Sequence, residues 1–119
     1  MITLVLLPGM DGTGTLFAPF VEILGARFNV KVVRYPTTEP MGYSELETVA
    51  RALLPTEGRF VILGESFSGP VAIAMAASCS SRLKGLILCC SFARNPYPFF
   101  SGFKYFVGTL SVSIVPRSV

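Results

Sequence analysis

Four short apolar runs alternate with helix-like segments along the chain, and this alternation constrains the fold more than any other feature. Each run is continuous and rich in β-branched residues or leucine, as in a strand that is buried on both faces of a sheet. The runs are Ile2–Leu7, Val30–Tyr35, Phe60–Leu63 and Leu86–Cys90. Strands that alternate with helices form parallel sheets through right-handed crossovers. The pattern therefore predicts an α/β fold with a doubly wound parallel sheet of about four strands, in the order 2-1-3-4, with helices on both faces.

Three helices are predicted between these strands from apolar residues at helical spacing. The first covers residues 16–24, the second ends at Pro55, and the third is the alanine-rich segment Pro70–Ala77. In the second helix, Ser44 and Glu47 match a capping box, in which a serine caps the helix start and a glutamate three residues later reaches back to it. Ser44 is therefore the predicted N-cap.

The composition is more apolar than that of a typical soluble domain: 51% of the residues are hydrophobic and 14% are charged. It indicates either extensive burial or apolar surface left for a partner or for missing chain. No apolar run reaches the roughly 20 residues of a spanning helix, and no secretory signal precedes the first strand, so we expect no membrane span. The basic residues behind the net charge of +3 are scattered, so we expect no nucleic-acid partner.

Three cysteines occur in the chain, at Cys79, Cys89 and Cys90, and no histidine accompanies them. The odd count and the absence of a Cys-x-x-Cys spacing argue against a disulfide framework and against a zinc site. We therefore expect buried, reduced thiols in a cytoplasmic protein, with no metal.

The turn after the third predicted strand carries the strongest chemical signal, Gly64-Glu65-Ser66-Phe67-Ser68-Gly69. A serine hydroxyl becomes a useful nucleophile when a structure exposes it, deprotonates it and stabilises the oxyanion that it creates. A sharp strand-to-helix turn exposes the serine and needs small residues on either side, which Gly64, Ser68 and Gly69 supply. The helix that begins near Phe67 directs its N-terminus at developing negative charge. Ser66 is therefore the predicted nucleophile.

Two other interpretations of this segment stay open. The first is an ordinary tight turn between a strand and a helix, with a serine that only caps the helix. The second makes Glu65 the general base for Ser66, although neighbouring side chains on such a turn diverge. We expect Glu65 instead to face solvent or to accept hydrogen bonds.

The loop after the first strand, Leu7-Pro8-Gly9-Met10-Asp11-Gly12, is the second candidate feature. The strand order reverses at this strand, so its end lies beside the end of the third strand, in the crevice where ligands bind. The Gly9-Met10 backbone is therefore expected beside Ser66, and the amides of Met10 and Phe67 are the predicted oxyanion hole. A phosphate cradle is the alternative, but the glycine spacing matches neither common nucleotide motif and no lysine follows.

With these two motifs, the chain resembles the α/β-hydrolase superfamily, in the neighbourhood of small bacterial carboxylesterases and pimeloyl-ester-type hydrolases. The matching segments are Leu6–Gly12 and Gly64–Gly69, and the resemblance covers roughly residues 1–94. It implies hydrolysis of a small-molecule ester, thioester or amide through an acyl-enzyme on Ser66, without a cofactor.

The chain departs from that superfamily on the C-terminal side of Ser66. Members of the superfamily carry the acid and the histidine of the triad after the serine, whereas this chain has no histidine and nothing acidic after Glu65. The resemblance implies that residues 1–94 are the N-terminal part of a hydrolase core, and that residues 95–119 begin a lid or cap that is cut short. We therefore expect the chain alone to be inactive or incomplete.

A non-catalytic α/β module that binds an acyl ligand or a partner protein is the competing interpretation, together with the product of a degenerate gene fragment. It accounts for the missing base. It also accounts for the edge of the fourth strand, Leu86–Cys90, which is expected to be exposed and available for pairing or for a missing C-terminal half.

Overall fold

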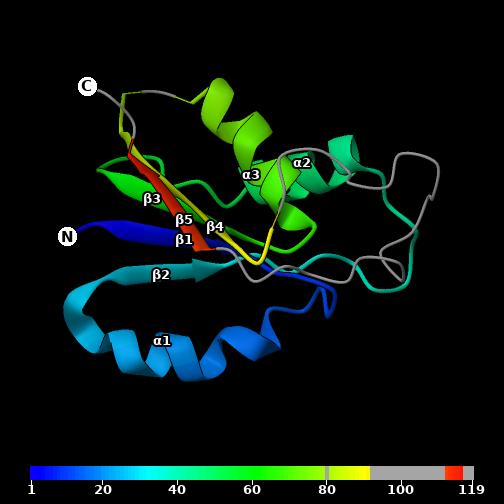
Figure 1. Ribbon diagram of the computed structural model, residues 1–119, viewed down its shortest axis with the longest axis horizontal. Helices are drawn as coiled ribbons and strands as arrows, with labels where there is room; N and C mark the ends of the chain where they lie inside the picture. The colour runs from blue at the N-terminus through cyan, green and yellow to red at the C-terminus, as the bar shows by residue number, and fades with distance from the viewer. Residues whose placement is uncertain (80, 92–111, 117–119) are drawn as a thin grey trace.

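The computed structural model describes residues 1–79, 81–91 and 112–116 (Figure 1). Its strands and helices follow the predicted alternation, with one strand more than predicted. The strands are β1 (Thr3–Leu7), β2 (Asn29–Val32), β3 (Phe60–Glu65), β4 (Leu83–Cys89) and β5 (Val112–Pro116). The α-helices are α1 (Ala18–Leu24), α2 (Tyr43–Arg51) and α3 (Ser68–Ala77), and two 3-10 turns, Thr15–Phe17 and Gly25–Arg27, flank α1.

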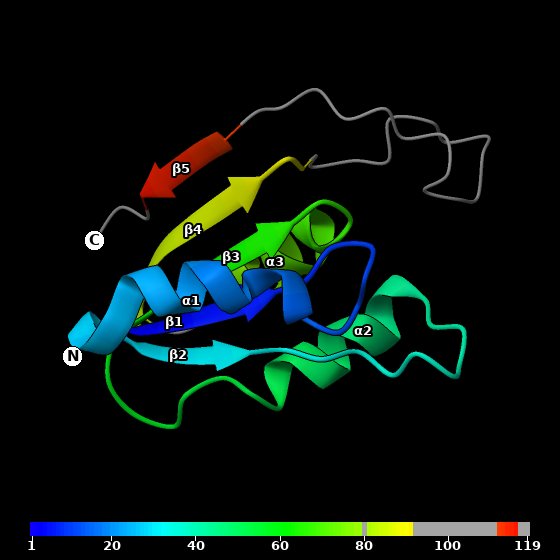
Figure 2. The same ribbon diagram turned by 90° about the horizontal axis from the view of Figure 1, so that it is seen from below.

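The sheet has the order β2-β1-β3-β4-β5, and its first four strands are all parallel. The predicted parallel order 2-1-3-4 is therefore confirmed. α1 covers one face of the sheet, and α2 and α3 cover the other (Figure 1; Figure 2 views the α1 face). This two-sided cover confirms the doubly wound arrangement. Because β1, β3 and β4 are parallel neighbours, their carboxyl ends lie together at the same end of the sheet.

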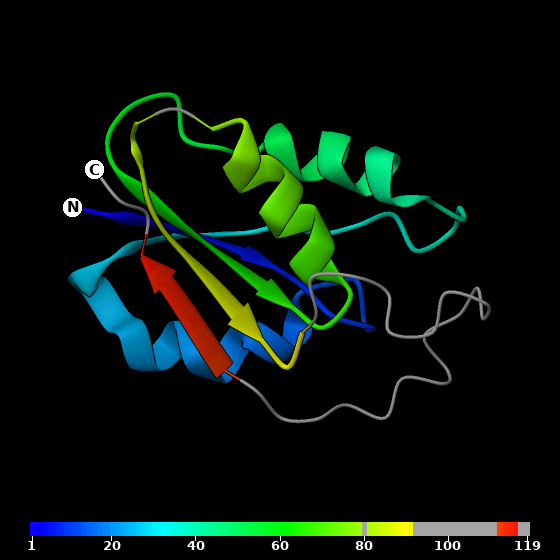
Figure 3. The same cartoon turned by 45° about the horizontal axis from the view of Figure 1, so that its top comes forward.

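The fifth strand corrects one prediction. β5 pairs antiparallel with β4, with Val112 opposite Cys89 and Pro116 opposite Gly85 (Figure 3). The edge of β4 is therefore covered and is not exposed as expected, because β5 supplies partners for its backbone groups. Apart from this strand, the segment predicted to begin a lid lies outside the described residues from residue 92 onward, so its role stays a prediction.

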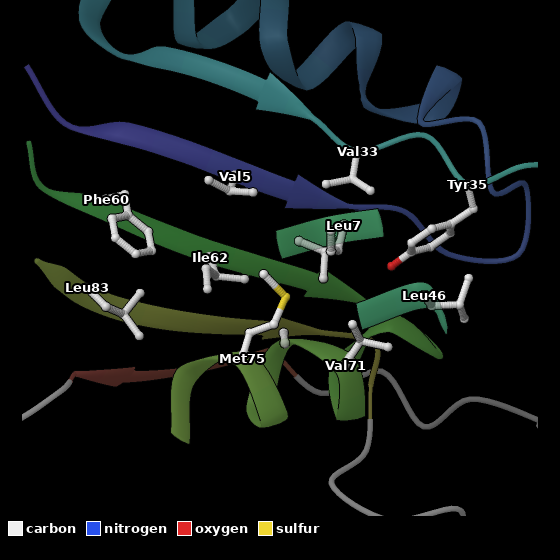
Figure 4. Close-up of a cluster of buried hydrophobic side chains, with 12 residues drawn as sticks. Val5, Leu7, Val33, Tyr35, Leu46, Phe60, Ile62, Val71, Met75 and Leu83 are labelled. Atoms are coloured by element: carbon white, nitrogen blue, oxygen red, sulfur yellow. The ribbon is translucent and has the colours of Figure 1, made fainter. Parts of the chain in front are cut away.

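The larger hydrophobic core lies between the sheet and the α2–α3 layer (Figure 4). Val5, Leu7 and Ile62 reach it from β1 and β3, and Met75 reaches it from α3, each fully buried. A smaller cluster around Leu6 lies on the α1 face. α1 itself has no buried residue, and Ile23 on that helix is 82% exposed. The α2–α3 side therefore provides most of the hydrophobic stabilisation near the site.

The predicted capping box of α2 is wrong. The helix begins two residues earlier, after the N-cap Gly42, and no side chain caps it. Ser44 therefore lies inside the first turn. Glu47 does not reach back to the helix start, because its carboxylate pairs with Arg51 one turn later, at 2.7 Å. The Arg51 guanidinium also donates to Ser78 Oγ at the end of α3, so it joins the two helices.

No helix in the part of the chain that the structure describes is long and apolar enough to cross a membrane.

The three cysteines, Cys79, Cys89 and Cys90, are free but only half-buried. Their predicted burial is therefore wrong, since two of them lie at the end of β4 and the third follows α3.

Gly64 permits the closest contact between β3 and α3. A Cβ added there would lie 2.8 Å from the Ala72 Cβ and 2.8 Å from the Ser68 carbonyl oxygen. We expect Gly64→Ala to lower the free energy of unfolding by about 1–3 kcal/mol, because the helix backbone has to move. Urea denaturation measures this loss. Gly85→Ala is the control, since its Cβ would meet Val61 at an ordinary 3.6 Å; equal losses in the two variants would contradict the account.

Candidate active site

The turn between β3 and α3 holds Ser66 by its backbone. The Ser66 N–H donates to the Cys89 carbonyl at 3.0 Å, and the Ser66 carbonyl accepts from the Gly69 N–H at 3.0 Å. The Ser91 hydroxyl donates to the same Ser66 carbonyl. Contacts from β4, from the segment after it and from α3 therefore fix the peptide groups of Ser66, and none of these contacts uses its hydroxyl.

Ser66 has a left-handed backbone conformation, with φ of 52°. Residues with a Cβ adopt this region uncommonly, and the conformation costs on the order of 1–2 kcal/mol per residue. Surrounding structure can sustain such strain, which is found most often at functional sites. The sharp turn predicted for the Gly64–Gly69 segment is therefore present, and Ser66 is its strained residue.

Gly9, two residues past the end of β1, lies directly against this turn. A Cβ added to Gly9 would lie 3.3 Å from the Ser66 Cβ and 3.2 Å from the Glu65 carboxyl carbon. The two segments meet because β1 and β3 are neighbours in the sheet, with Leu7 opposite Gly64. The structure thus brings together the two segments that the sequence predicted to be adjacent.

The loop after Gly9 folds as a tight turn. The Gly12 N–H donates to the Gly9 carbonyl at 2.9 Å, and the Tyr35 N–H donates to the Gly12 carbonyl at 2.7 Å. Gly12 itself has a left-handed φ of 64°, which favours glycine at this place. Among the described residues no acceptor binds the Met10 N–H, and Met10 is 71% exposed. Its amide is therefore available to a ligand.

A buried pair of hydroxyls lies beneath the turn. Ser68 is fully buried, and its hydroxyl donates to the Pro8 carbonyl. The Tyr35 hydroxyl is 2.8 Å from Ser68 Oγ, and the Tyr35 ring lies 5.9 Å from that of Phe67. Tyr35 closes one end of the hydrophobic cluster in Figure 4. Burial raises the pKa of Tyr35 to about 12, so its hydroxyl stays protonated at neutral pH.

Glu65 packs its carboxyl group against Gly9. Burial raises the pKa of the Glu65 carboxyl, and Asp11 raises it further, while the Gly9 amide acts in the opposite direction by stabilising the carboxylate. This placement agrees with the expected hydrogen-bonded role for Glu65. It gives no support to Glu65 as the base, because the carboxyl group lies on Gly9.

The remaining parts of a catalytic triad are not within reach of Ser66. The chain contains no histidine. In residues 1–79 and 81–91 no side chain hydrogen-bonds to Ser66 Oγ. The same described residues contain no group of three or more His, Cys, Asp or Glu side chains that could hold a metal ion.

Two residues of this site were not predicted from the sequence. Tyr35 was assigned to the end of a strand, although a tyrosine at the carboxyl end of a buried strand brings a hydroxyl to the ligand-binding edge. Ser91, one residue past the Cys89-Cys90 pair, carried no recognisable signal. Ser68 was expected only as a small residue, but its hydroxyl takes part in two hydrogen bonds.

Comparison with known proteins gives one informative similarity. The chain is 35% identical to phytyl ester synthase 1, chloroplastic, of Arabidopsis thaliana over 103 aligned residues. The alignment covers 79% of this chain but only 15% of that protein, so the chain spans a small part of the relative's length. No family model matches the chain, and no solved structure matches it. Together with the parallel sheet, the similarity supports a hydrolase-like α/β fold.

The strain at Ser66 predicts an unusual stability effect. Ser66→Gly removes the Cβ that disfavours a left-handed φ, whereas Ser66→Ala keeps it. We expect the glycine variant to be more stable than the alanine variant by about 1 kcal/mol, measured by urea denaturation. Equal stability of the two variants would show that the Ser66 backbone is not strained.

The environment of Glu65 predicts a pH-dependent effect. Burial and Asp11 raise the pKa of Glu65 in the folded state. The contribution of Glu65 to the free energy of unfolding is therefore complete below its ordinary pKa of 4.5, and it is lost as the pH rises through the folded-state pKa. Glu65→Gln removes the charge but keeps a carbonyl acceptor for Gly9. We expect this variant to be more stable than the native protein at neutral pH and equal to it well below that ordinary value.

Thermal denaturation across this pH range measures the effect. Glu57→Gln, at an exposed position of the loop before β3, is the control for the loss of one carboxylate. A difference in melting temperature between Glu65→Gln and the native protein that stays constant with pH would contradict a raised pKa of Glu65.

Proposed function

We propose that Ser66 is the acyl-accepting nucleophile of an ester-acting protein. The left-handed conformation of Ser66 beside Gly9 is the observation that carries this proposal. Three hydrogen bonds hold the peptide groups of Ser66, two from backbone partners and one from the Ser91 hydroxyl. A strand–turn–helix elbow of this kind presents a serine hydroxyl above the end of the sheet. An ordinary tight turn needs no such strain at the serine.

The chemistry depends on the groups around Ser66. Ser66 Oγ attacks the carbonyl carbon of an ester or thioester, the Ser66–acyl bond forms, and the bond to the alcohol or thiol breaks as that group leaves with a proton. Water then takes the acyl group and completes hydrolysis. An alcohol in place of water would form a new ester, as the name of the Arabidopsis relative suggests for that protein.

The Met10 and Phe67 amides are the proposed oxyanion hole. Among the described residues the Met10 N–H has no partner, and the neighbouring Gly9 lies so close to Ser66 that an added Cβ would be 3.3 Å from the Ser66 Cβ. Phe67 is the N-cap of α3, so its amide belongs to the positive end of that helix. Losing one such donor typically costs about 10²–10³ in rate.

The general base is proposed to lie outside these 119 residues, since they include no histidine. Residues 1–94 then supply the nucleophile and the oxyanion donors of a hydrolase core, and residues 95–119 begin its lid. With two triad members missing, the chain alone retains at most a rate of about 10³–10⁴ over water. The substrate, a small-molecule ester or acyl compound, and the cytoplasmic location are parts of the same proposal.

A non-catalytic binding module is the second candidate, and the missing histidine favours it. Such a module would still use the free Met10 amide to bind the carbonyl or carboxylate of an acyl ligand. Reactivity of Ser66 separates the two candidates, because a binding module needs no activated serine.

A fluorophosphonate probe tests the proposal. Its phosphorus forms a bond to the serine oxygen as fluoride leaves, and the oxyanion donors stabilise that step. With imidazole added in place of the missing base, we expect peptide mass spectrometry to find the modification at Ser66, none in Ser66→Ala, and unchanged labelling in Ser44→Ala, a control on the exposed side of α2. Labelling spread evenly over surface serines would rule out an activated Ser66.

The same chain should show no measurable turnover of p-nitrophenyl esters, because it lacks a base. Robust turnover that disappears in Ser66→Ala would contradict that part of the proposal. It would show that another group within these residues takes the proton.

A further inference from the structure

The hydroxyls of Tyr35 and Ser68 form a hydrogen-bonded chain whose direction is determined. Ser68 Oγ has one hydrogen, and it points to the Pro8 carbonyl, which can only accept. The hydrogen between Tyr35 and Ser68, whose oxygens are 2.8 Å apart, therefore belongs to Tyr35. The order is Tyr35 Oη–H to Ser68 Oγ–H to the Pro8 carbonyl, and it joins the segment after β2 to α3 and to the end of β1.

The Pro8–Gly9 peptide group is held through its carbonyl, which accepts from the buried Ser68 hydroxyl. The Gly9 end of this planar group lies beside the Glu65 carboxyl group. The Ser68 bond therefore limits rotation of the peptide group.

The next peptide group along the chain contains the Met10 N–H. Its carbonyl, on Gly9, is held by the Gly12 N–H at 2.9 Å. In a planar trans peptide the N–H points away from the carbonyl. The direction of the Met10 N–H is therefore set by the Gly12 bond, provided that Gly9 itself stays in place.

We propose that Tyr35 and Ser68 are positioning residues for the oxyanion loop: their buried hydroxyl chain holds Gly9 against Ser66 and so aims the Met10 amide. This inference rests on the proposed function of Ser66. It gives the Ser68 hydroxyl a positioning role, which an alanine or glycine at that place could not perform. A Cβ added to Gly9 would lie 3.3 Å from the Ser66 Cβ, so the loop is close enough that a small shift changes the distance between the Met10 amide and Ser66.

The burial of both residues makes this chain costly to interrupt. Ser68 is fully buried and Tyr35 is 5% exposed. Water therefore has little access to replace a lost hydroxyl, and an unpaired partner stays unsatisfied. Tyr35 also keeps its proton through neutral pH, because burial raises its pKa to about 12.

Two variants and one matched control test the proposal on the 119-residue chain. Ser68→Ala removes the donor to the Pro8 carbonyl, and Tyr35→Phe removes only the hydroxyl that orients Ser68. Ser78→Ala is the same substitution at the far end of α3, where the serine binds Arg51 instead. Melting temperatures establish that each variant is folded.

The primary measurement is the Met10 amide signal in assigned ¹H–¹⁵N NMR spectra. We expect its chemical shift and its temperature coefficient to change in Ser68→Ala, to change less in Tyr35→Phe, and to stay at the native values in Ser78→Ala. A general loss of stability would not change the Met10 amide signal in particular. If Ser68→Ala does not fold, the comparison between Tyr35→Phe and Ser78→Ala decides. If Ser68→Ala folds and its Met10 signal is native, the proposal is overturned. If Ser68→Ala does not fold, a native Met10 signal in Tyr35→Phe overturns it.

A second measurement separates this proposal from that for Ser66. Phenylboronic acid bonds to a reactive serine oxygen, the boron becomes tetrahedral and anionic, and the serine proton passes to the buffer; ¹¹B NMR reports the adduct. We expect binding that requires Ser66 and weakens about tenfold in Ser68→Ala, less than the loss of a whole oxyanion donor. Absence of any adduct in the native chain would count against Ser66 as the nucleophile, while the Met10 signal would still decide the positioning role.

Discussion

The close approach of α3 to the end of β3 is the contact on which the candidate site depends. Only a glycine fits at Gly64, since any Cβ there would meet Ala72 and the Ser68 backbone at 2.8 Å. Because the helix starts so near the strand, the chain has to reverse within two residues, and Ser66 takes a left-handed conformation to do so. The strain is sustained by hydrogen bonds to Cys89, Gly69 and Ser91. Packing between two layers thus places a half-buried serine in a strained turn.

Strand order brings the rest of the site to that serine. β1 lies between β2 and β3, so the loop after β1 meets the turn after β3 on one side and the segment after β2 on the other. Tyr35, Ser68 and Pro8 come from these three places and share one buried hydrogen-bonded chain. The loop after β1 and the turn that holds Ser66 are therefore parts of one packed unit, and the stability of the fold and the geometry of the candidate site are linked.

The sequence predicted the features that depend on short-range patterns. Continuous apolar runs indicated the four parallel strands, and the strand order of a doubly wound sheet placed Gly9 beside Ser66. The Tyr35–Ser68 pair could not be foreseen in this way, because it joins residues 33 positions apart through side-chain packing. The capping box failed because Glu47 has a competing partner in Arg51. β5 was missed because its pairing with β4 depends on a distant segment.

The central claim is the proposal that Ser66 is a nucleophile whose general base lies outside these 119 residues. Chemical complementation tests it most directly: imidazole, added to the 119-residue chain, can supply the missing general base for the cleavage of p-nitrophenyl butyrate. The account predicts an imidazole-dependent rate above that of imidazole alone, a butyryl group on Ser66 by mass spectrometry, and loss of both in Ser66→Ala. The same imidazole-dependent rate in native protein and Ser66→Ala, or a butyryl group on another residue, would contradict it.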